Sequence, residues 1–261
     1  FYAGTNITTG TANTIVGGSA GDALTDGGTN TLVGYDAGGS LTSGGSNVAV
    51  GAYALKTEDG NGFNVAIGYS ALEMLNAGAN AYNVGIGYKA GEAMTTGTEN
   101  TIIGGLAGDA LTTGTYNVAI GYQALTTEDT GGRSIAIGTQ ALQTQNNNDN
   151  NYNIAIGHNA AQALTTGTNN IFIGGIAADT ITTGDSNVAI GKNAMGSADG
   201  SESNNVAVGF GTLAAMNNDA SNYNVAVGYN ACTAVTTGDQ NTVIGGLSGD
   251  ALTTGTRNVS L

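Results

Sequence analysis

Proline and tryptophan are absent from this sequence of 261 residues, and cysteine and histidine occur once each. A single cysteine excludes a disulfide framework and a cysteine-cluster metal site, and a single histidine excludes a zinc site built from several histidines. No apolar run approaches the ~20 residues of a membrane-spanning helix. We therefore expect no membrane insertion.

Basic residues are also scarce. Five lysines and arginines stand against nineteen acidic residues, so the net charge is −14, and charged residues make up only 9% of the chain. A protein that neutralises phosphates needs clustered lysine and arginine, because the phosphate backbone dominates its affinity for nucleic acid. The charge balance thus argues against nucleic acid and against anionic membranes as partners.

Glycine is abundant instead, with 45 residues. Collagen is excluded because glycine does not recur at every third position and proline is missing. Disorder would suit such a composition, but 40% of the residues are hydrophobic and they recur at fixed intervals. The chain is therefore expected to fold as a repeat array.

The repeating unit is Asn-Val-Ala-Ile-Gly, with variations, at intervals of 17 to 19 residues. The units begin at Asn13, Asn30, Asn47, Asn64, Asn83, Asn100, Asn117, Ser134, Asn153, Asn170, Asn187, Asn205, Asn224, Asn241 and Asn258. A second period of 70 or 71 residues carries Asn13 to Asn83, Asn153 and Asn224, which indicates duplication of a four-coil unit. We assign residues 1–12 to a lead-in that continues an upstream region or a partial coil, and residues 13–261 to one array without a linker.

Each repeat is expected to form one coil of a parallel β-solenoid. In the repeat that begins at Asn117, the β-branched residues Val118 and Ile120 favour a strand, and Gly121 provides a corner free of a β-carbon. The stretch 111–114, Leu-Thr-Thr-Gly, predicts a second short strand and a second corner. The fold class is therefore all-β, a single-stack parallel β-solenoid or β-roll of about fifteen coils of 17–19 residues. The first asparagine of each repeat is expected to stack into an internal hydrogen-bonded ladder.

Strand alternation leads to a hypothesis about assembly. We expect Val118 and Ile120 to face the inside of the coil, with Ala119 between them pointing outward. This third position is never charged, and an outward stripe of small and apolar side chains is typical of an interface between chains. The alternative is that the third-position side chains are small because they make a close contact within their own coil. The predicted interchain contacts are Leu32, Ala49, Ala66, Ile102, Ala119, Ala136, Ala155, Phe172, Ala189, Ala207, Ala226 and Val243.

These motifs resemble a known repeat class. The segments 117–125, Asn-Val-Ala-Ile-Gly-Tyr-Gln-Ala-Leu, and 64–72, together with Thr-Thr-Gly-Thr at 112–115, are similar to the head repeats of trimeric autotransporter (YadA-like) adhesins and to repeats of phage tail fibres. The resemblance covers residues 13 to 261. It implies a left-handed β-roll and a homotrimer, neither of which follows from the spacing. The coils that begin at Asn47, Asn117 and Asn187 depart from the pattern, because loops replace their Thr-Thr-Gly stretch.

The resemblance also implies a function. We expect the structural shaft of a homotrimeric fibre on a phage virion, a tail fibre or similar appendage that acts as a rigid spacer for host attachment. Its partners would be other fibre or virion proteins and a host surface receptor. The alternative is a bacterial cell-surface adhesin head or extracellular filament protein. The segment is expected to be part of a longer product, and neither its host nor its receptor follows from the sequence.

Acidic loops that recur about every 70 residues are the one candidate metal site. Carboxylates from such loops could bind Ca²⁺ if several chains brought them together around an axis. The simpler interpretation is a solvated loop that keeps the chain soluble and blocks association at sheet edges. The calcium candidates are Glu58, Asp59, Glu128, Asp129 and Asp199.

Nothing in the sequence predicts catalysis or a cofactor, and we expect no enzymatic activity. Acidic residues are plentiful, but a regular coil offers no obvious cleft for a glycosidase pair, which leaves a glycan-cleaving tailspike as a remote option. Ice binding is disfavoured because the threonine rows are interrupted in every four coils. His158 replaces tyrosine in a row of aromatic residues, and Cys232 lies four coils away from it.

Overall fold

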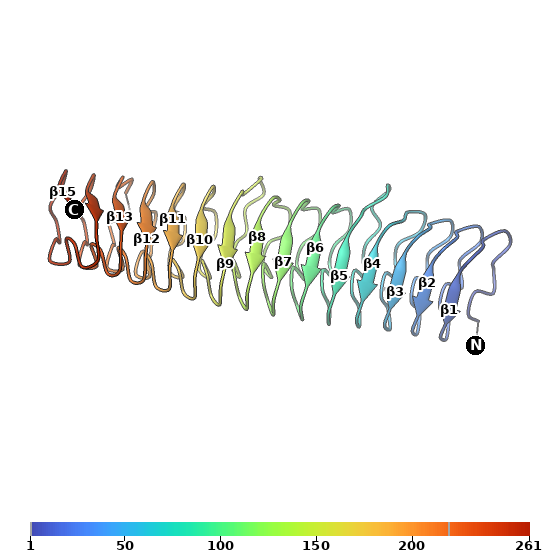
Figure 1. The fold of residues 1–261 in the computed structure, drawn as a ribbon. Helices are drawn as coiled ribbons and strands as arrows, with labels where there is room; N and C mark the ends of the chain where they lie inside the picture. Colours follow the sequence, from blue (N-terminus) through green and yellow to red (C-terminus); the bar gives the residue numbers. More distant parts are fainter. Residues whose placement is uncertain (1, 219) are drawn as a thin grey trace. The chain divides into compact units, whose positions relative to one another are not determined.

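The computed structural model describes residues 2–218 and 220–261 and divides the chain into two units, Phe1–Gly132 and Arg133–Leu261. Each unit consists of short strands that succeed one another along the sequence (Figure 1). The first unit contains β1 (Thr14–Val16), β2 (Thr31–Val33), β3 (Val48–Val50), β4 (Val65–Ile67), β5 (Val84–Ile86), β6 (Thr101–Ile103) and β7 (Val118–Ile120). The second contains β8 (Ile135–Ile137), β9 (Ile154–Ile156), β10 (Ile171–Ile173), β11 (Val188–Ile190), β12 (Val206–Val208), β13 (Val225–Val227), β14 (Thr242–Ile244) and β15 (Val259–Ser260).

Within each unit, every strand pairs in parallel with the next one in the sequence. The register aligns equivalent repeat positions, so that Thr31 lies beside Val48 and Leu32 beside Ala49. The same register recurs in the second unit, where Phe172 lies beside Ala189. No residue among 2–218 and 220–261 is helical. The predicted all-β parallel β-solenoid is thus confirmed for both units.

The corner after each strand requires glycine. The φ angle of Gly68 is +134°, a conformation that side-chain-bearing residues rarely adopt. A β-carbon at Gly68 would lie 2.3 Å from the carbonyl oxygen of Gly87, the corner glycine of the next coil. The same close approach recurs along each unit, which explains why this position is glycine in every complete repeat.

The prediction of a second strand in each coil is wrong. Residues 111–114 contain a bend at Thr112 and Thr113 and no strand. Their backbone still bonds to the neighbouring coils, since Thr95 N donates to Thr112 O at 2.8 Å and Thr112 N donates to Asp129 O at 2.6 Å. Each coil therefore has one strand, and turns that are hydrogen-bonded to the adjacent coils complete it.

The asparagine ladder is present as predicted. Asn117 N donates to the Oδ1 atom of Asn100 at 2.9 Å, and Asn100 N donates in the same way to Asn83 at 2.9 Å. At most rungs the side-chain amide also donates forward, as from Asn100 Nδ2 to Gly114 O at 2.9 Å. These asparagines are buried, so the ladder satisfies polar groups inside the coil.

The predicted facing of the strands is wrong. Ala119 is fully buried inside its own chain, whereas Val118 and Ile120 on either side are partly exposed. The third-position side chains cannot be interchain contacts, because the coil itself removes them completely from solvent. This correction covers Leu32, Ala49, Ala66, Ile102, Ala119, Ala136, Ala155, Phe172, Ala189, Ala207, Ala226 and Val243.

Core volume is shared between the third position and the residue six places later. At most small third positions, such as Ala119, the partner is large, here Leu125, and both are fully buried. Gly85 with Gly91 and Ala155 with Ala161 are exceptions, since both members of these pairs are small. Where the third position is large, as at Leu32, the partner is Gly38, whose β-carbon would lie 2.9 Å from Leu32 Cδ2. The narrow coil interior has room for only one large side chain of each pair.

Candidate interaction surface

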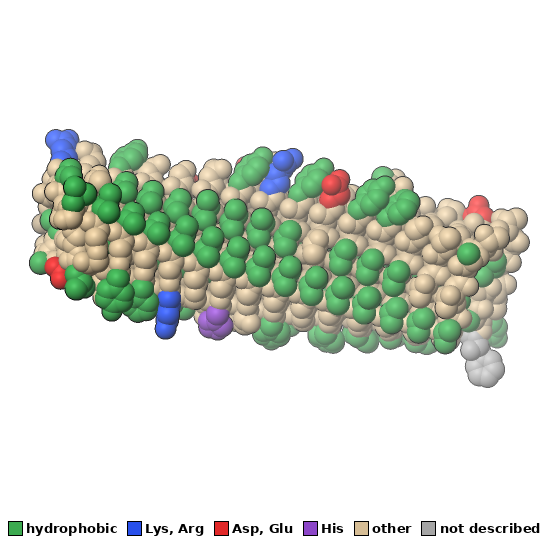
Figure 2. All heavy atoms as spheres, in the orientation of Figure 1, with side chains coloured by type: hydrophobic (Ala, Val, Ile, Leu, Met, Phe, Trp, Pro, Cys, Tyr) green, Lys and Arg blue, Asp and Glu red, His purple; other side chains and the backbone are tan. Residues whose placement is uncertain are grey.

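The most distinctive surface is the outward side of the strands, which we name the Val/Ile face. It comprises the first and third residues of the strands, which the corrected facing leaves partly exposed. Its aliphatic members in the first unit are Val16, Val33, Val48, Val50, Val65, Ile67, Val84, Ile86, Ile103, Val118 and Ile120. In the second unit they are Ile135, Ile137, Ile154, Ile156, Ile171, Ile173, Val188, Ile190, Val206, Val208, Val225, Val227, Ile244 and Val259. Figure 2 shows apolar side chains in rows over the strands.

The Val/Ile face carries no charge. Its remaining positions in the strands are Thr14, Thr31, Thr101 and Thr242. Most side chains of the face are half-buried, and Thr14, Val16, Ile67, Ile244 and Val259 are exposed. Contiguous exposed apolar surface is a common feature of interaction sites in soluble proteins, which makes the Val/Ile face the candidate surface of this chain.

Two margins border the Val/Ile face. The entry margin is the residue just before each ladder asparagine, and the exit margin is the residue just after each corner glycine. Aromatic side chains are frequent in both, and the tyrosines and phenylalanines there are 45% to 58% exposed. Neighbouring rings of one margin stack: the centroids of Phe63 and Tyr82 are 5.1 Å apart at the entry margin, and those of Tyr69 and Tyr88 are 5.7 Å apart at the exit margin.

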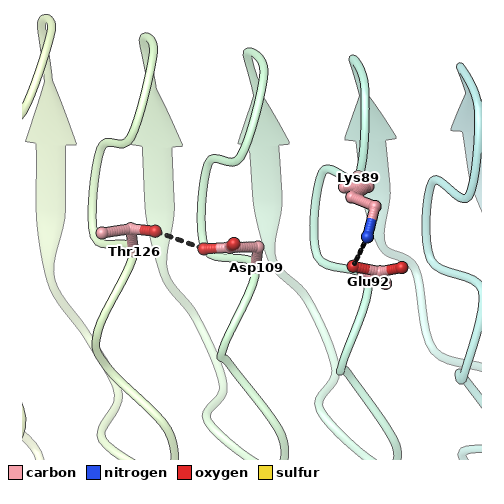
Figure 3. A network of polar contacts seen from close by, with 4 residues as sticks. All are labelled: Lys89, Glu92, Asp109 and Thr126. Carbon is pink, nitrogen blue, oxygen red and sulfur yellow. Dashed lines mark hydrogen bonds and ion pairs between the residues drawn. The ribbon is translucent and has the colours of Figure 1, made fainter.

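A polar row lies beyond the exit margin. Lys89 Nζ is 3.0 Å from Glu92 Oε2, and in a nearby coil Thr126 Oγ1 donates to Asp109 Oδ1 of the preceding coil (Figure 3). The hydrogen bond that Lys89 donates to Glu92, followed by the negative charge of Glu92, raises the pKa of Lys89. The charged side chains of Lys89, Glu92 and Asp109 thus lie outside the Val/Ile face.

The calcium candidates do not converge within the described chain. Glu58 and Glu128 are fully buried, and each carboxylate binds its own loop. Glu58 Oε1 accepts from Asn61 Nδ2 at 2.8 Å, and Glu128 Oε1 accepts from Gly131 N at 2.8 Å. These two glutamates are therefore turned away from any site shared between chains, whereas Asp59 and Asp199 are exposed and Asp129 is partly exposed.

Sequence analysis missed a polar substitution inside the core. Gln145 is fully buried at a position where most coils carry an aliphatic residue or methionine, such as Leu111 and Leu164. Its Nε2 atom donates to Ser134 Oγ at 2.9 Å, and its Oε1 atom accepts from Asn153 Nδ2 at 2.8 Å. Gln145 thus connects the one serine of the ladder to the next asparagine. The signal in the sequence was that serine and glutamine depart from the pattern in the same coil.

The single histidine lies at the surface, as expected of a member of the aromatic row, and the single cysteine lies in the core. His158 is exposed at the exit margin, and Cys232 is buried. Desolvation by burial raises the pKa of the Cys232 thiol to about 11. Burial also raises the pKa of Asp179.

Over residues 2–218 and 220–261, the structure contains no pocket and no group of three histidine, cysteine or acidic side chains that could hold a metal ion. The same residues include no helix that is long and apolar enough to cross a bilayer. No protein family, curated protein or solved structure matches the sequence. The Val/Ile face and its margins are therefore the features on which a functional argument can be built.

Proposed function

We propose that this chain is a structural segment of a fibre made of identical chains, and specifically the shaft of a homotrimeric tail fibre or similar appendage of a phage virion. The observation that carries the proposal is the uncharged Val/Ile face. The number three, the left-handed coil and the placement on a virion rest on the resemblance of the repeats to tail-fibre and YadA-like adhesin repeats.

The physical argument starts from the cost of leaving the Val/Ile face in water. Full burial of a valine or isoleucine side chain is worth about 1.5–3 kcal/mol relative to exposure. Most strands of each unit contribute two such side chains, already half-buried, to the same side. Covering the face with copies of itself would gain part of that free energy at every coil, as in obligate oligomers whose interfaces resemble a domain core.

The architecture also suits a spacer. Strands, corners and ladder asparagines all bond from coil to coil, so the backbone connections run along the stacking direction. A shaft of this kind would hold other fibre or virion proteins and a host-binding tip at a fixed separation. No catalytic step is needed for that role.

A bacterial cell-surface adhesin head or extracellular filament is the alternative use of the same assembly. The resemblance of the repeats favours it as well as the phage fibre. The flanking sequence separates the two, since a membrane-anchor domain would favour the adhesin and a virion-attachment or chaperone domain would favour the tail fibre.

Charge placed on the Val/Ile face tests the proposal. The double variant Ile86→Glu/Ile103→Glu introduces two carboxylates into the proposed contact, and Thr96→Glu/Thr113→Glu introduces the same charge at exposed turns of the same two coils. Because an unpaired charge in an interface is strongly unfavourable, we expect the first variant to lower the assembled fraction at least tenfold at equal concentration. The second variant should assemble as the unmodified chain does.

Sedimentation velocity measures the assembled fraction, and far-ultraviolet circular dichroism shows whether each variant keeps its β-structure. Equal assembly of the two variants would contradict the proposal.

A further inference from the structure

A single asparagine of this chain is followed by glycine. Asn61 precedes Gly62 in the loop between β3 and β4, and every other asparagine precedes a residue with a side chain. Asparagine is a thermolabile residue because its amide is lost when the next backbone nitrogen attacks the side chain. Glycine favours this attack, since it has no β-carbon to obstruct the approach and allows a wide range of backbone angles. Asn61 is therefore the asparagine of this sequence most prone to deamidation.

The reaction needs only water. The backbone nitrogen of Gly62 loses its proton and attacks the Cγ atom of Asn61, which closes a five-membered succinimide ring. The bond between Cγ and Nδ2 then breaks, and ammonia leaves. Water opens the ring at either carbonyl and leaves aspartate or isoaspartate at position 61. Both products carry one more negative charge than asparagine, and isoaspartate also lengthens the main chain by one carbon.

Hydrogen bonds hold both reacting groups in the fold. Asn61 Nδ2 donates to Glu58 Oε1 at 2.8 Å, and the backbone nitrogen of Asn61 donates to the same oxygen at 3.2 Å. Gly62 N, the attacking atom, donates to Asn80 Oδ1 in the next coil at 3.2 Å. Asn47 Nδ2 fixes the peptide group between the two residues by donating to Asn61 O at 2.9 Å. The attack therefore requires this part of the coil to open first.

The loop 76–81 of the next coil makes that opening unfavourable. Ala81 N donates to Gly62 O at 3.4 Å, and Gly62 is buried. Glu58 is also fully buried, and its second oxygen, Oε2, lies 3.5 Å from Ala77 N. The loop is thus bonded both to the glycine that would attack and to the glutamate that holds the asparagine amide.

We propose that Asn61 is a site of spontaneous deamidation, that the folded coil keeps it unreactive, and that its reaction releases the loop 76–81 irreversibly. After the reaction, a carboxylate stands where the amide donated to Glu58 Oε1. Two carboxylates in contact repel each other, most strongly where burial removes solvent. The original bonds of Glu58 and the loop therefore do not form again. This proposal is independent of the proposed fibre.

Peptide mapping by mass spectrometry tests the site on the complete chain. The chain is incubated at neutral pH with and without guanidinium chloride, and conversion is followed at every asparagine, with an isoaspartate methyltransferase to label isoaspartate. We expect Asn61 to convert before any other asparagine in denaturant, and at least about tenfold more slowly in the folded chain. Conversion at equal rates in both conditions would overturn the protection by the fold. Conversion of other asparagines first in denaturant would overturn the site itself.

Two variants of the loop test which contact protects the site. Asn80→Ala removes the acceptor of Gly62 N, and Asn76→Ala is the matched control at another exposed asparagine of the same loop. We expect Asn61 of the folded chain to convert about fivefold faster in Asn80→Ala, the change that corresponds to the loss of one ordinary hydrogen bond. The control should convert as the unmodified chain does. Equal rates in the two variants would overturn the protection by Asn80.

Substitution of Asn61 itself tests the release of the loop. Asn61→Asp reproduces one product, and Asn61→Ser removes the amide without adding a charge. Hydrogen exchange of the peptide 74–81, measured by mass spectrometry, reports whether the loop is still bonded. We expect exchange to be at least about tenfold faster in Asn61→Asp than in Asn61→Ser. Equal exchange in the two variants would overturn the release of the loop by the new charge.

Discussion

At the residue scale, the ladder asparagines join successive coils at two points each. Asn100 accepts a hydrogen bond from the backbone of Asn117 and donates one to Gly114 O, both at 2.9 Å. These two bonds need a side chain of fixed length with both an acceptor and a donor, which asparagine provides. The regular recurrence of asparagine made this ladder predictable. The hydrogen bonds of Gln145 with Ser134 and Asn153 were not predictable, because a repeat pattern does not tell which core residue contacts the shorter serine side chain.

Replacing Gln145 tests how much its hydrogen bonds with Ser134 and Asn153 contribute to stability. Gln145→Leu leaves Ser134 Oγ and Asn153 Nδ2 without the bonds they make to this side chain, so we expect a loss of about 1–3 kcal/mol in the free energy of unfolding. Adding Ser134→Asn restores the standard pair of asparagine and leucine and should recover most of the loss. Urea unfolding followed by circular dichroism measures both variants. A double variant that is no more stable than Gln145→Leu alone would contradict this account.

At the element scale, the facing of the strand follows from the ladder. Side chains two positions apart on a strand share a side. If Asn117 is inside the coil, Ala119 must be inside as well, and Val118 and Ile120 must point outward. The strand, its parallel pairing and its glycine corner were predictable from local pattern. The expectation that larger apolar residues lie inside failed, because Leu125 from the following turn fills the space beside Ala119.

A volume swap tests this packing. Ala119→Leu alone should overpack the core and cost about 1–3 kcal/mol, and Leu125→Gly alone should leave a cavity and cost about 3–5 kcal/mol. Together they recreate the pair found at Leu32 and Gly38, and glycine also suits the φ of +55° at position 125. We therefore expect the double variant to unfold within ~1 kcal/mol of the unmodified chain. A double variant less stable than both single variants would refute the proposed sharing of volume.

At the scale of the whole molecule, each unit buries its small third-position residues and leaves its valines and isoleucines at the surface. In the proposed fibre, copies of the same chain would cover the Val/Ile face, and the repeat spacing of one copy equals that of the next. The repeat array was predictable from the sequence. The position of the Val/Ile face was not predictable, because it depends on which side of a three-residue strand the turns occupy.

The mass of the intact chain in solution tests this central claim most directly. Sedimentation equilibrium at micromolar concentration and neutral pH should give a single species of three times the chain mass of 25.6 kDa. A stable species of 25.6 kDa over the whole concentration range would mean that the Val/Ile face stays in water, and it would contradict the account.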